Sequence, residues 1–196
     1  MMLNDLSSTL SLLETRRSGR PREMVAPGPS EAELEQILTI AARTPDHGKL
    51  FPWRFVVVSL DQRDALADLL LAALPESDPD AGPAHVAKAR EFAHQAPALV
   101  VLIAAPVAGH KIPEWEQELS VGAAGMNLLL ATHALGYVGG WITGWAAYSE
   151  RVRAAFCAPG ERIAGFLFLG SPGVDLQERP RAPLAAVVRP WTPPSV

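Results

Sequence analysis

Apolar residues along this chain recur with helical spacing in some stretches and form unbroken runs in others. Where they return every three or four residues, one face of a helix is apolar, and the pattern predicts an amphipathic helix. Ser30 and Glu33 form a capping box ahead of one such stripe, and Asp61 stands ahead of another. The helices predicted in this way cover residues 3–15, 30–43, 61–74, 84–94 and 114–135, with a short one after Ser149.

Unbroken apolar runs predict strands instead, because a strand that is buried on both faces needs no polar positions. The run at 98–105 does not alternate at all, so we expect it in the centre of a sheet. Segments rich in proline and glycine at 16–29 and 75–83 are predicted loops. The proline-rich tail after Gly170 extends from the core, and Ala185–Val188 is a candidate for one more strand, in the same subunit or another. The predicted strands cover residues 55–60, 98–105, 137–142 and 163–169.

These elements predict a single domain of the α+β class over residues 1–196. We expect a mainly antiparallel sheet of four to five strands wrapped by helices, with an extended tail over 171–196. The helix at 114–135 is apolar or small around most of its circumference. A helix of that kind is buried against several elements or against a partner subunit.

Composition narrows the class of protein. The chain has 196 residues and a formal net charge of -4, which argues against a nucleic-acid binder because such proteins carry a basic face. A single cysteine, Cys157, rules out an intrachain disulfide and suits a reducing compartment. We find no signal-peptide pattern and no apolar stretch long enough to span a bilayer, so we expect a soluble, cytoplasmic protein that needs no membrane. The five histidines lack metalloprotease spacing, and we expect no metal site.

Three short segments carry the candidate chemistry, and the first is Arg16-Arg17-Ser18 at the end of the opening helix. A phosphate dianion needs charge-assisted donors, which two guanidinium groups and a hydroxyl supply. Arg20 follows two residues later and extends the basic cluster. The alternative interpretation is a pair of solvated arginines at a helix C-terminus, where cations are favoured in any case.

The second segment runs from Arg43 to Trp53 and joins a helix end to the first predicted strand. Side chains in such a turn reach into the space beside the sheet. We expect His47 to present a polar group to a ligand there, and the alternative is a histidine of a surface loop. Asp46 is expected to hydrogen-bond the backbone of its own turn rather than to act as an acid.

The third segment, Gly139–Gly144, follows a predicted strand. Glycines let a backbone come close to a planar ring and point N–H groups at its heteroatoms. A tight turn between strand and loop is the alternative interpretation. The spacing of Gly136, Gly139 and Gly140 does not fit the dinucleotide-binding fingerprint.

In order and spacing, these three segments resemble the small FMN-dependent nitroreductases, most closely the compact YdjA-like branch, from about Leu3 to Gly170. The run His110–Glu116 resembles the same branch. The resemblance implies a nitroreductase-like fold and an intimate homodimer with two FMN sites built across its interface. It also implies an oxidoreductase whose flavin takes hydride from NADH or NADPH and then reduces a nitroaromatic or other electron-poor small molecule in a ping-pong cycle.

The resemblance also assigns residues. No side chain has to act as an acid or a base, so it names no certain catalytic residue. Phe51 replaces a polar residue at the flavin edge, and Thr143 stands where close relatives have an arginine. Two further functions stay open: a flavin enzyme with a dedicated enone, quinone or dehydrogenation substrate, and a flavin-binding member with little turnover. The matched FMN contacts are Arg16, Arg17, Ser18, Arg20, Arg43, His47, Ile142, Thr143 and Gly144, and the matched nicotinamide contacts are Ala131, Thr132, His133, Ala134, Leu135 and Gly136.

Overall fold

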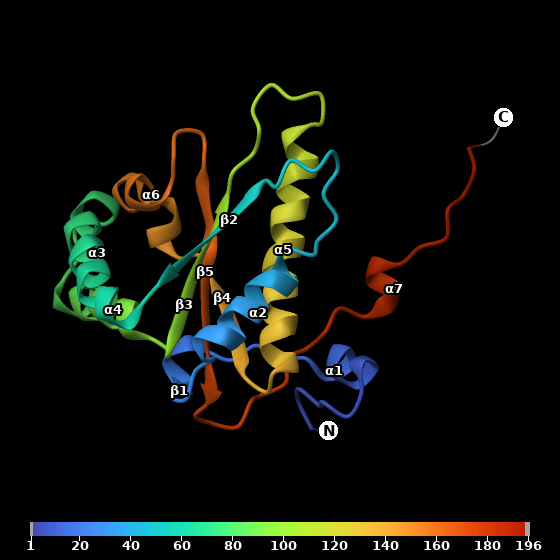
Figure 1. The fold of residues 1–196 in the computed structure, drawn as a ribbon, viewed down its shortest axis with the longest axis horizontal. Coiled ribbons are helices and arrows are strands. Elements are labelled where there is room, and N and C mark those ends of the chain that lie inside the picture. Colours follow the sequence, from blue (N-terminus) through green and yellow to red (C-terminus); the bar gives the residue numbers. More distant parts are fainter. Residues whose placement is uncertain (1, 195–196) are drawn as a thin grey trace.

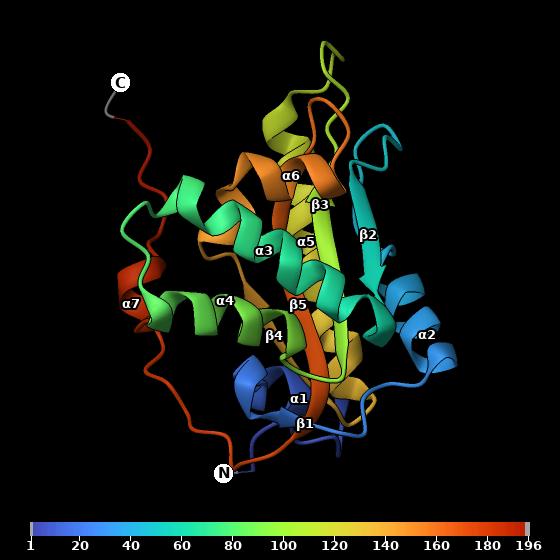
Figure 2. The ribbon, with the colours of Figure 1, turned by 90° about the vertical axis from the view of Figure 1, so that its left-hand side faces the viewer.

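A five-stranded sheet lies between two layers of helices in the computed structural model of the protein (Figure 1; Figure 2). The structure describes residues 2–194, so residues 1, 195 and 196 of the predicted domain and tail lie outside the described residues. The helices are α1 (Thr9–Thr15), α2 (Glu31–Ala41), α3 (Arg63–Ser77), α4 (Pro83–His94), α5 (Glu114–Ala134), α6 (Glu150–Phe156) and α7 (Leu184–Val187). The strands are β1 (Met24–Val25), β2 (Trp53–Val58), β3 (Ala98–Ala104), β4 (Val138–Ile142) and β5 (Arg162–Pro172).

The sheet is antiparallel at every pairing, in the order β1-β5-β3-β2, with β4 also paired to β5. Val101 of β3 lies opposite Val56 of β2 on one side and Phe166 of β5 on the other. The unbroken apolar run therefore forms a central strand, and the predicted α+β fold with a mainly antiparallel sheet is confirmed. Alternate residues of β3 and β5 enter two separate cores, one on each face of the sheet.

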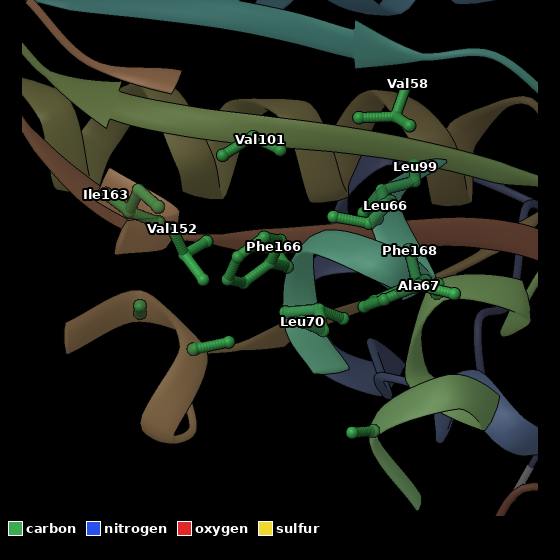
Figure 3. Packing of buried hydrophobic residues seen from close by; sticks show 14 of the residues in the cluster. Val58, Leu66, Ala67, Leu70, Leu99, Val101, Val152, Ile163, Phe166 and Phe168 are labelled. Atoms are coloured by element: carbon green, nitrogen blue, oxygen red, sulfur yellow. The ribbon is translucent and has the colours of Figure 1, made fainter. Parts of the chain in front are cut away.

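The first core lies between the sheet and the layer formed by α3, α4 and α6 (Figure 1; Figure 3). Leu66 and Leu70 of α3 pack against the β5 phenylalanines there. Phe92 of α4 meets the rings of Phe166 and Phe168 edge to face, each at a centroid distance of 5.2 Å. Helix α4 therefore covers the phenylalanines of β5.

The second core lies between the opposite face and α2 with α5. Trp141 of β4 fills the space where α5 passes the sheet, and its indole N–H donates to the Ala164 carbonyl at 3.0 Å. The ring lies directly against Gly125 of α5 and Gly165 of β5, where a Cβ atom at either position would collide with it. Both glycines therefore set how closely α5 approaches the sheet. Among residues 2–194, no helix is both long enough and apolar enough to cross a membrane.

The opening helix differs from its prediction. It begins at Thr9 rather than near residue 3, because the Ser8 hydroxyl accepts the Ser11 N–H and caps the helix there. Leu12 is the apolar residue that it buries. The stripe that predicted the helix, which consists of Leu6, Leu10 and Leu13, is exposed in this single chain.

Three other boundaries were predicted wrongly. The segment 16–29 is not all loop, since Met24–Val25 pairs with the end of β5 as strand β1. Helix α3 begins at Arg63, after a short 3-10 turn at Leu60–Gln62, and continues through Pro75 to Ser77. A proline so near the helix end removes one hydrogen bond without stopping the last turn. Residues 184–187 form the short helix α7 instead of a strand, and no strand among residues 2–194 pairs with them.

Candidate cofactor site

The Arg16-Arg17-Ser18 segment follows α1, and hydrogen bonds to its backbone hold it on both sides. Asn4 holds Arg17 from both sides: the Asn4 Oδ1 accepts the Arg17 N–H at 2.7 Å, and the Asn4 Nδ2 donates to the Arg17 carbonyl at 3.1 Å. One residue beyond Ser18, the Gly19 N–H donates to the Gly139 carbonyl of β4 at 3.2 Å. A Cβ atom at Gly140 would lie 2.7 Å from the Gly19 oxygen, so only glycine admits this close approach.

Arg16 and Ser18 point toward one another, since the Arg16 Nη1 donates to the Ser18 Oγ at 3.2 Å. The tail packs over them. The Arg181 Nη2 donates to the Arg16 carbonyl at 3.1 Å, and the Arg17 Nε donates to the Gln177 carbonyl at 2.6 Å. Sequence spacing could not reveal this contact, because the partners stand about 160 positions apart.

The resulting cation cluster consists of Arg16, Arg17, Arg179 and Arg181. Burial lowers the pKa of Arg16 below its ordinary value, and the charge of Arg181 lowers it further. Glu178 is the carboxylate that faces these cations, and its Oε1 accepts from the Arg181 Nη2 at 2.9 Å. Cations thus outnumber the carboxylate, and the cluster has the charge of an anion site.

Arg20 lines a small cavity together with Arg17 and Ser18, but its charge is paired with a carboxylate. Its Nη1 pairs with the Glu23 Oε1 at 2.8 Å, and its side chain is mostly exposed. Its contact with the cofactor stays a prediction.

The Arg43–Trp53 turn is ordered by Asp46. The Asp46 carboxylate accepts the N–H of Leu50 at 3.2 Å and that of Phe51 at 2.8 Å, so its predicted role as a turn residue is confirmed. These bonds hold Phe51 at a φ of 50°, in the left-handed region that a bulky residue rarely adopts. The Phe51 ring is left exposed, with its edge toward Trp53.

His47 meets the start of α5. Its Nδ1 lies 2.7 Å from the Glu116 Oε2 in the first turn of that helix. The Arg43 carbonyl accepts from the Asn127 Nδ2 at 3.2 Å, so the turn lies along α5. The run His110–Glu116, which resembled the nitroreductases on its own, is therefore assembled beside the second segment. Glu116 of this run is a partner of His47 that the sequence did not reveal.

The third segment opens onto a cavity of about 580 Å³. Gly144 has a φ of 58°, and a Cβ atom there would meet nothing within 4 Å, so the backbone is open to a ligand. Two ion pairs border the cavity, Arg162 with Glu118 at 2.8 Å and Arg153 with Glu150 at 2.6 Å. Its lining is mostly apolar and includes Trp115, Leu119, Gly122, Trp141, Thr143 and Tyr148.

One chain does not gather the predicted FMN contacts into a single cluster. His47 contacts Glu116 in the first turn of α5, whereas the Arg16-Arg17-Ser18 segment meets β4 through Gly19, beside His133 in the last turn. Those two turns are about 25 Å apart along the helix axis, which exceeds the length of an FMN molecule. Figure 1 places the loop before β2 beside one half of α5 and α1 beside the other end.

The predicted nicotinamide contacts are divided between interior and surface. Ala131, Thr132 and His133 are buried, while Ala134 and Gly136 are exposed and Leu135 is half-buried. The His133 Nε2 accepts the Gly139 N–H at 3.2 Å. Burial, together with the charge of Arg16, lowers the pKa of His133 to about 4. Nicotinamide contact stays a prediction for this segment, and only its last three residues are open to a ligand.

The residues present fit a phosphorylated flavin. Clustered guanidinium groups and the Ser18 hydroxyl suit the phosphate, and a largely apolar cavity beside an open glycine backbone suits a flat ring. In the part of the chain that the structure describes, no three histidine, cysteine, aspartate or glutamate side chains are placed to hold a metal ion.

Comparisons with known proteins identify the family of the chain. The family model described as "Nitroreductase family" matches residues 13–171. The fold is that of a nitroreductase-like protein from Bacillus cereus, with a TM-score of 0.79 at 20% identity over 94% of this chain and 96% of that one. The chain therefore belongs to the nitroreductase family, and the resemblance drawn from the three segments is confirmed.

Two relatives are more similar in sequence. A Haemophilus influenzae protein, provisionally named an NAD(P)H nitroreductase, is 38% identical over 87% of this chain and 91% of its own length. The Escherichia coli (strain K12) protein YdjA, provisionally named in the same way, is 36% identical over 83% of this chain and 87% of its own length. The likeness to the YdjA branch thus extends over most of both chains.

Proposed function

We propose that this protein is an FMN-dependent NAD(P)H oxidoreductase that reduces nitroaromatic or other electron-poor small molecules. The observation that carries the proposal is the cation cluster around Arg16 and Ser18. Four arginines face one carboxylate there. The Asn4 side chain and the Gly139 carbonyl hold the segment that bears the Ser18 hydroxyl. A surface pair of solvated arginines would have no need of such fastening.

The FMN site is completed by a second copy of the chain. The predicted contacts at the two ends of α5 are too far apart for one flavin, and a two-fold dimer brings the His47 turn of one copy to the phosphate segment of the other. The outer side of α5 supports this arrangement, since it leaves Trp115 and Leu119 exposed. Large apolar side chains of this kind are typical of the centre of a subunit interface.

Bound flavin supplies the redox chemistry, because it accepts hydride from NADH or NADPH and passes it to an acceptor. The protein's residues bind and orient. Arg16, Ser18 and Arg181 hold the phosphate, and the backbone of Thr143 and Gly144 borders the ring. His47, held at Nδ1 by Glu116, presents Nε2 to the polar side of the flavin. The apolar cavity beside Trp115 excludes water from the acceptor.

Titration of the apo-protein with FMN tests the phosphate site. Arg16→Ala and Ser18→Ala should each weaken FMN binding by about 1.5–3 kcal/mol, since each removes a hydrogen bond to a charged group. Arg22→Ala, an exposed arginine of the same basic stretch, is the control and should bind as the parent does. Unchanged affinity in both site variants would reject the assignment.

Turnover is tested separately on the FMN-loaded protein. We expect NADH or NADPH to bleach the flavin absorption and a nitroaromatic to restore it, whereas His47→Ala should lose FMN or bleach more slowly. A protein that binds FMN and never bleaches would be a flavin-binding protein with little turnover. If bleached protein reacts with quinones or enones and not with nitroaromatics, the acceptor class proposed above is wrong.

A further inference from the structure

We propose that His133 is a positioning residue for the cofactor-phosphate segment, because its imidazole holds the start of β4 and, through it, the backbone at Gly19. The inference rests on the proposed FMN function. It adds a role for a buried side chain that does not line the apolar cavity beside Thr143. Family resemblance matched this residue only to a nicotinamide contact, which its burial does not favour.

The burial of His133 at this position carries a cost in folding free energy. Its side chain is 0% exposed in the last turn of α5. Because the Nε2 accepts the Gly139 N–H, the neutral ring must carry its proton on Nδ1. That Nδ1 finds no hydrogen-bond partner among residues 2–194. A buried donor without a partner destabilises the fold, so an apolar side chain would serve mere packing better. The hydrogen bond that Nε2 accepts from Gly139 therefore accounts for a histidine at this position.

Two successive hydrogen bonds connect the acceptor at Nε2 to the cofactor-phosphate segment. The Gly139 N–H donates to the His133 Nε2, and the Gly139 carbonyl accepts the Gly19 N–H, both at 3.2 Å. Gly19 is the residue after Ser18. A Cβ atom at the adjacent Gly140 would lie 2.7 Å from the Gly19 oxygen, so the two backbones are in close contact. A shift of Gly139 therefore moves Gly19, and with it the Ser18 hydroxyl.

The surroundings keep the imidazole in the form that this role needs. Burial and the nearby charge of Arg16 disfavour the imidazolium, so Nε2 keeps its lone pair at neutral pH. An imidazolium would lose the acceptor and add another cation behind an already cationic cluster. The ring thus acts as a fixed acceptor at neutral pH.

The expected consequence is preorganisation. A segment that is already held in its bound geometry loses less conformational freedom when phosphate arrives. Removal of the acceptor should then weaken FMN binding by more than any general loss of stability explains. A purely structural histidine would lower stability and leave the FMN affinity of the folded protein unchanged.

The test compares variants that keep or lose the acceptor. His133→Gln keeps an oxygen within reach of the Gly139 N–H, whereas His133→Asn is one methylene too short and His133→Leu has no acceptor. Ile37→Val, at a position of α2 that faces the second core, is the control for a modest loss of packing. FMN titration of each apo-protein is paired with its urea unfolding curve. We expect about 5- to 30-fold weaker FMN binding for Asn and Leu, as one lost hydrogen bond implies, and parental affinity within about threefold for Gln and Ile37→Val.

Hydrogen exchange supplies a readout that does not depend on the cofactor. The Gly19 amide should exchange faster in the Asn and Leu variants than in the parent, and at the parental rate in the Gln variant. If Asn is too unstable to titrate, Leu decides, because it also removes the unpaired Nδ1 donor. Equal FMN affinity in Leu and Ile37→Val, or a Gln variant as weak as Leu, would overturn this role alone. A parent that binds no FMN would overturn the proposed function together with it.

Discussion

The two faces of the sheet differ in how completely the chain covers them. On the α3, α4 and α6 side, Phe166 and Phe168 are 0% exposed and Phe92 closes over both rings. On the other side, the inner face of α5 is equally buried, but its outer face leaves Trp115 67% exposed and Leu119 56% exposed. Helix α4 thus covers the phenylalanines of the first core, whereas the other side presents apolar surface that a single chain does not cover.

Two arginines show the same contrast in charge. Arg63 is 2% exposed on the first side and donates to the main-chain carbonyls of Val58, Ala93 and Gln95. Arg16, near the end of α5, lies among further cations. The first guanidinium is enclosed by the fold, where its Nε and Nη1 donate to main-chain carbonyls, whereas the second lies at the surface beside other cations. Stability and binding are therefore assigned to different regions of one small domain.

The largest effect should come from breaking the covered side. Phe166→Ala removes a ring that packs within the first core, and we expect it to lower the free energy of unfolding by about 3–5 kcal/mol. Leu13→Ala, at an exposed position of α1, is the contrast and should change it by about 0.5 kcal/mol or less. Urea unfolding at one fixed protein concentration measures both. Similar losses in the two variants would remove the distinction between the regions.

Acid should act on the binding side through His133. Its pKa is 6.5 when unfolded and about 4 when folded, so between those values the unfolded chain binds a proton that the folded chain does not. Stability contributed by the neutral ring is therefore complete above pH 6.5 and falls as pH drops toward 4, by about 3 kcal/mol in total. Urea unfolding from pH 4 to 7 should show this slope in the parent. His133→Gln should lack this loss of stability between pH 6.5 and 4. If the free energies of unfolding of parent and variant fall in parallel with pH, the assignment is contradicted.

Exposed residues of α5 should control assembly. Trp115→Ala should weaken the proposed dimer by about 2 kcal/mol, or roughly 30-fold in its dissociation constant, as expected for an aromatic residue at an interface centre. Leu60→Ala removes a similarly exposed apolar side chain on the other side of the sheet and is the control. Sedimentation across micromolar concentrations measures the mass against the 21.0 kDa chain. A parent that stays monomeric while it holds FMN would reject the shared site.

The smallest effect concerns Glu178, the carboxylate that competes for the arginines of the phosphate site. Glu178→Gln should tighten FMN binding by about two- to fivefold, because exposed ion pairs contribute little and this one opposes the ligand. Glu76→Gln breaks a similarly exposed pair with Arg151 and should leave the affinity unchanged. Weaker FMN binding in Glu178→Gln would mean that the carboxylate orders Arg181 rather than competing with the phosphate.

Local patterns predicted local structure well. The unbroken run in β3 indicated a central strand, and the capping box at Ser30 marks the start of α2 as expected. Boundaries that depend on tertiary contacts were missed. Strand β1 has only two residues, and its pairing with the end of β5 leaves no periodicity to detect. The apolar stripe of α1 predicted burial that this chain alone does not provide.

The site was predictable in its parts and not in its assembly. Residue type and spacing singled out Arg16, Ser18 and the glycines of the third segment, and the family resemblance assigned them to FMN, a contact that stays a prediction. The pairing of His47 with Glu116 spans 69 positions, and that of Arg181 with Arg16 spans 165, so neither leaves a signal in one sequence. The division of the predicted FMN contacts between the two ends of α5 became visible only once the helix was placed.

The fastening of the Arg16-Arg17-Ser18 segment has a consequence for the order of synthesis. Asn4 secures the segment early, but its contacts with Gly139 and with Arg181 join residues made far later in translation. The nascent chain therefore exposes its arginines for most of its time on the ribosome, without the partners that define their geometry. The geometry around these arginines is therefore complete only after residue 181 has left the ribosome.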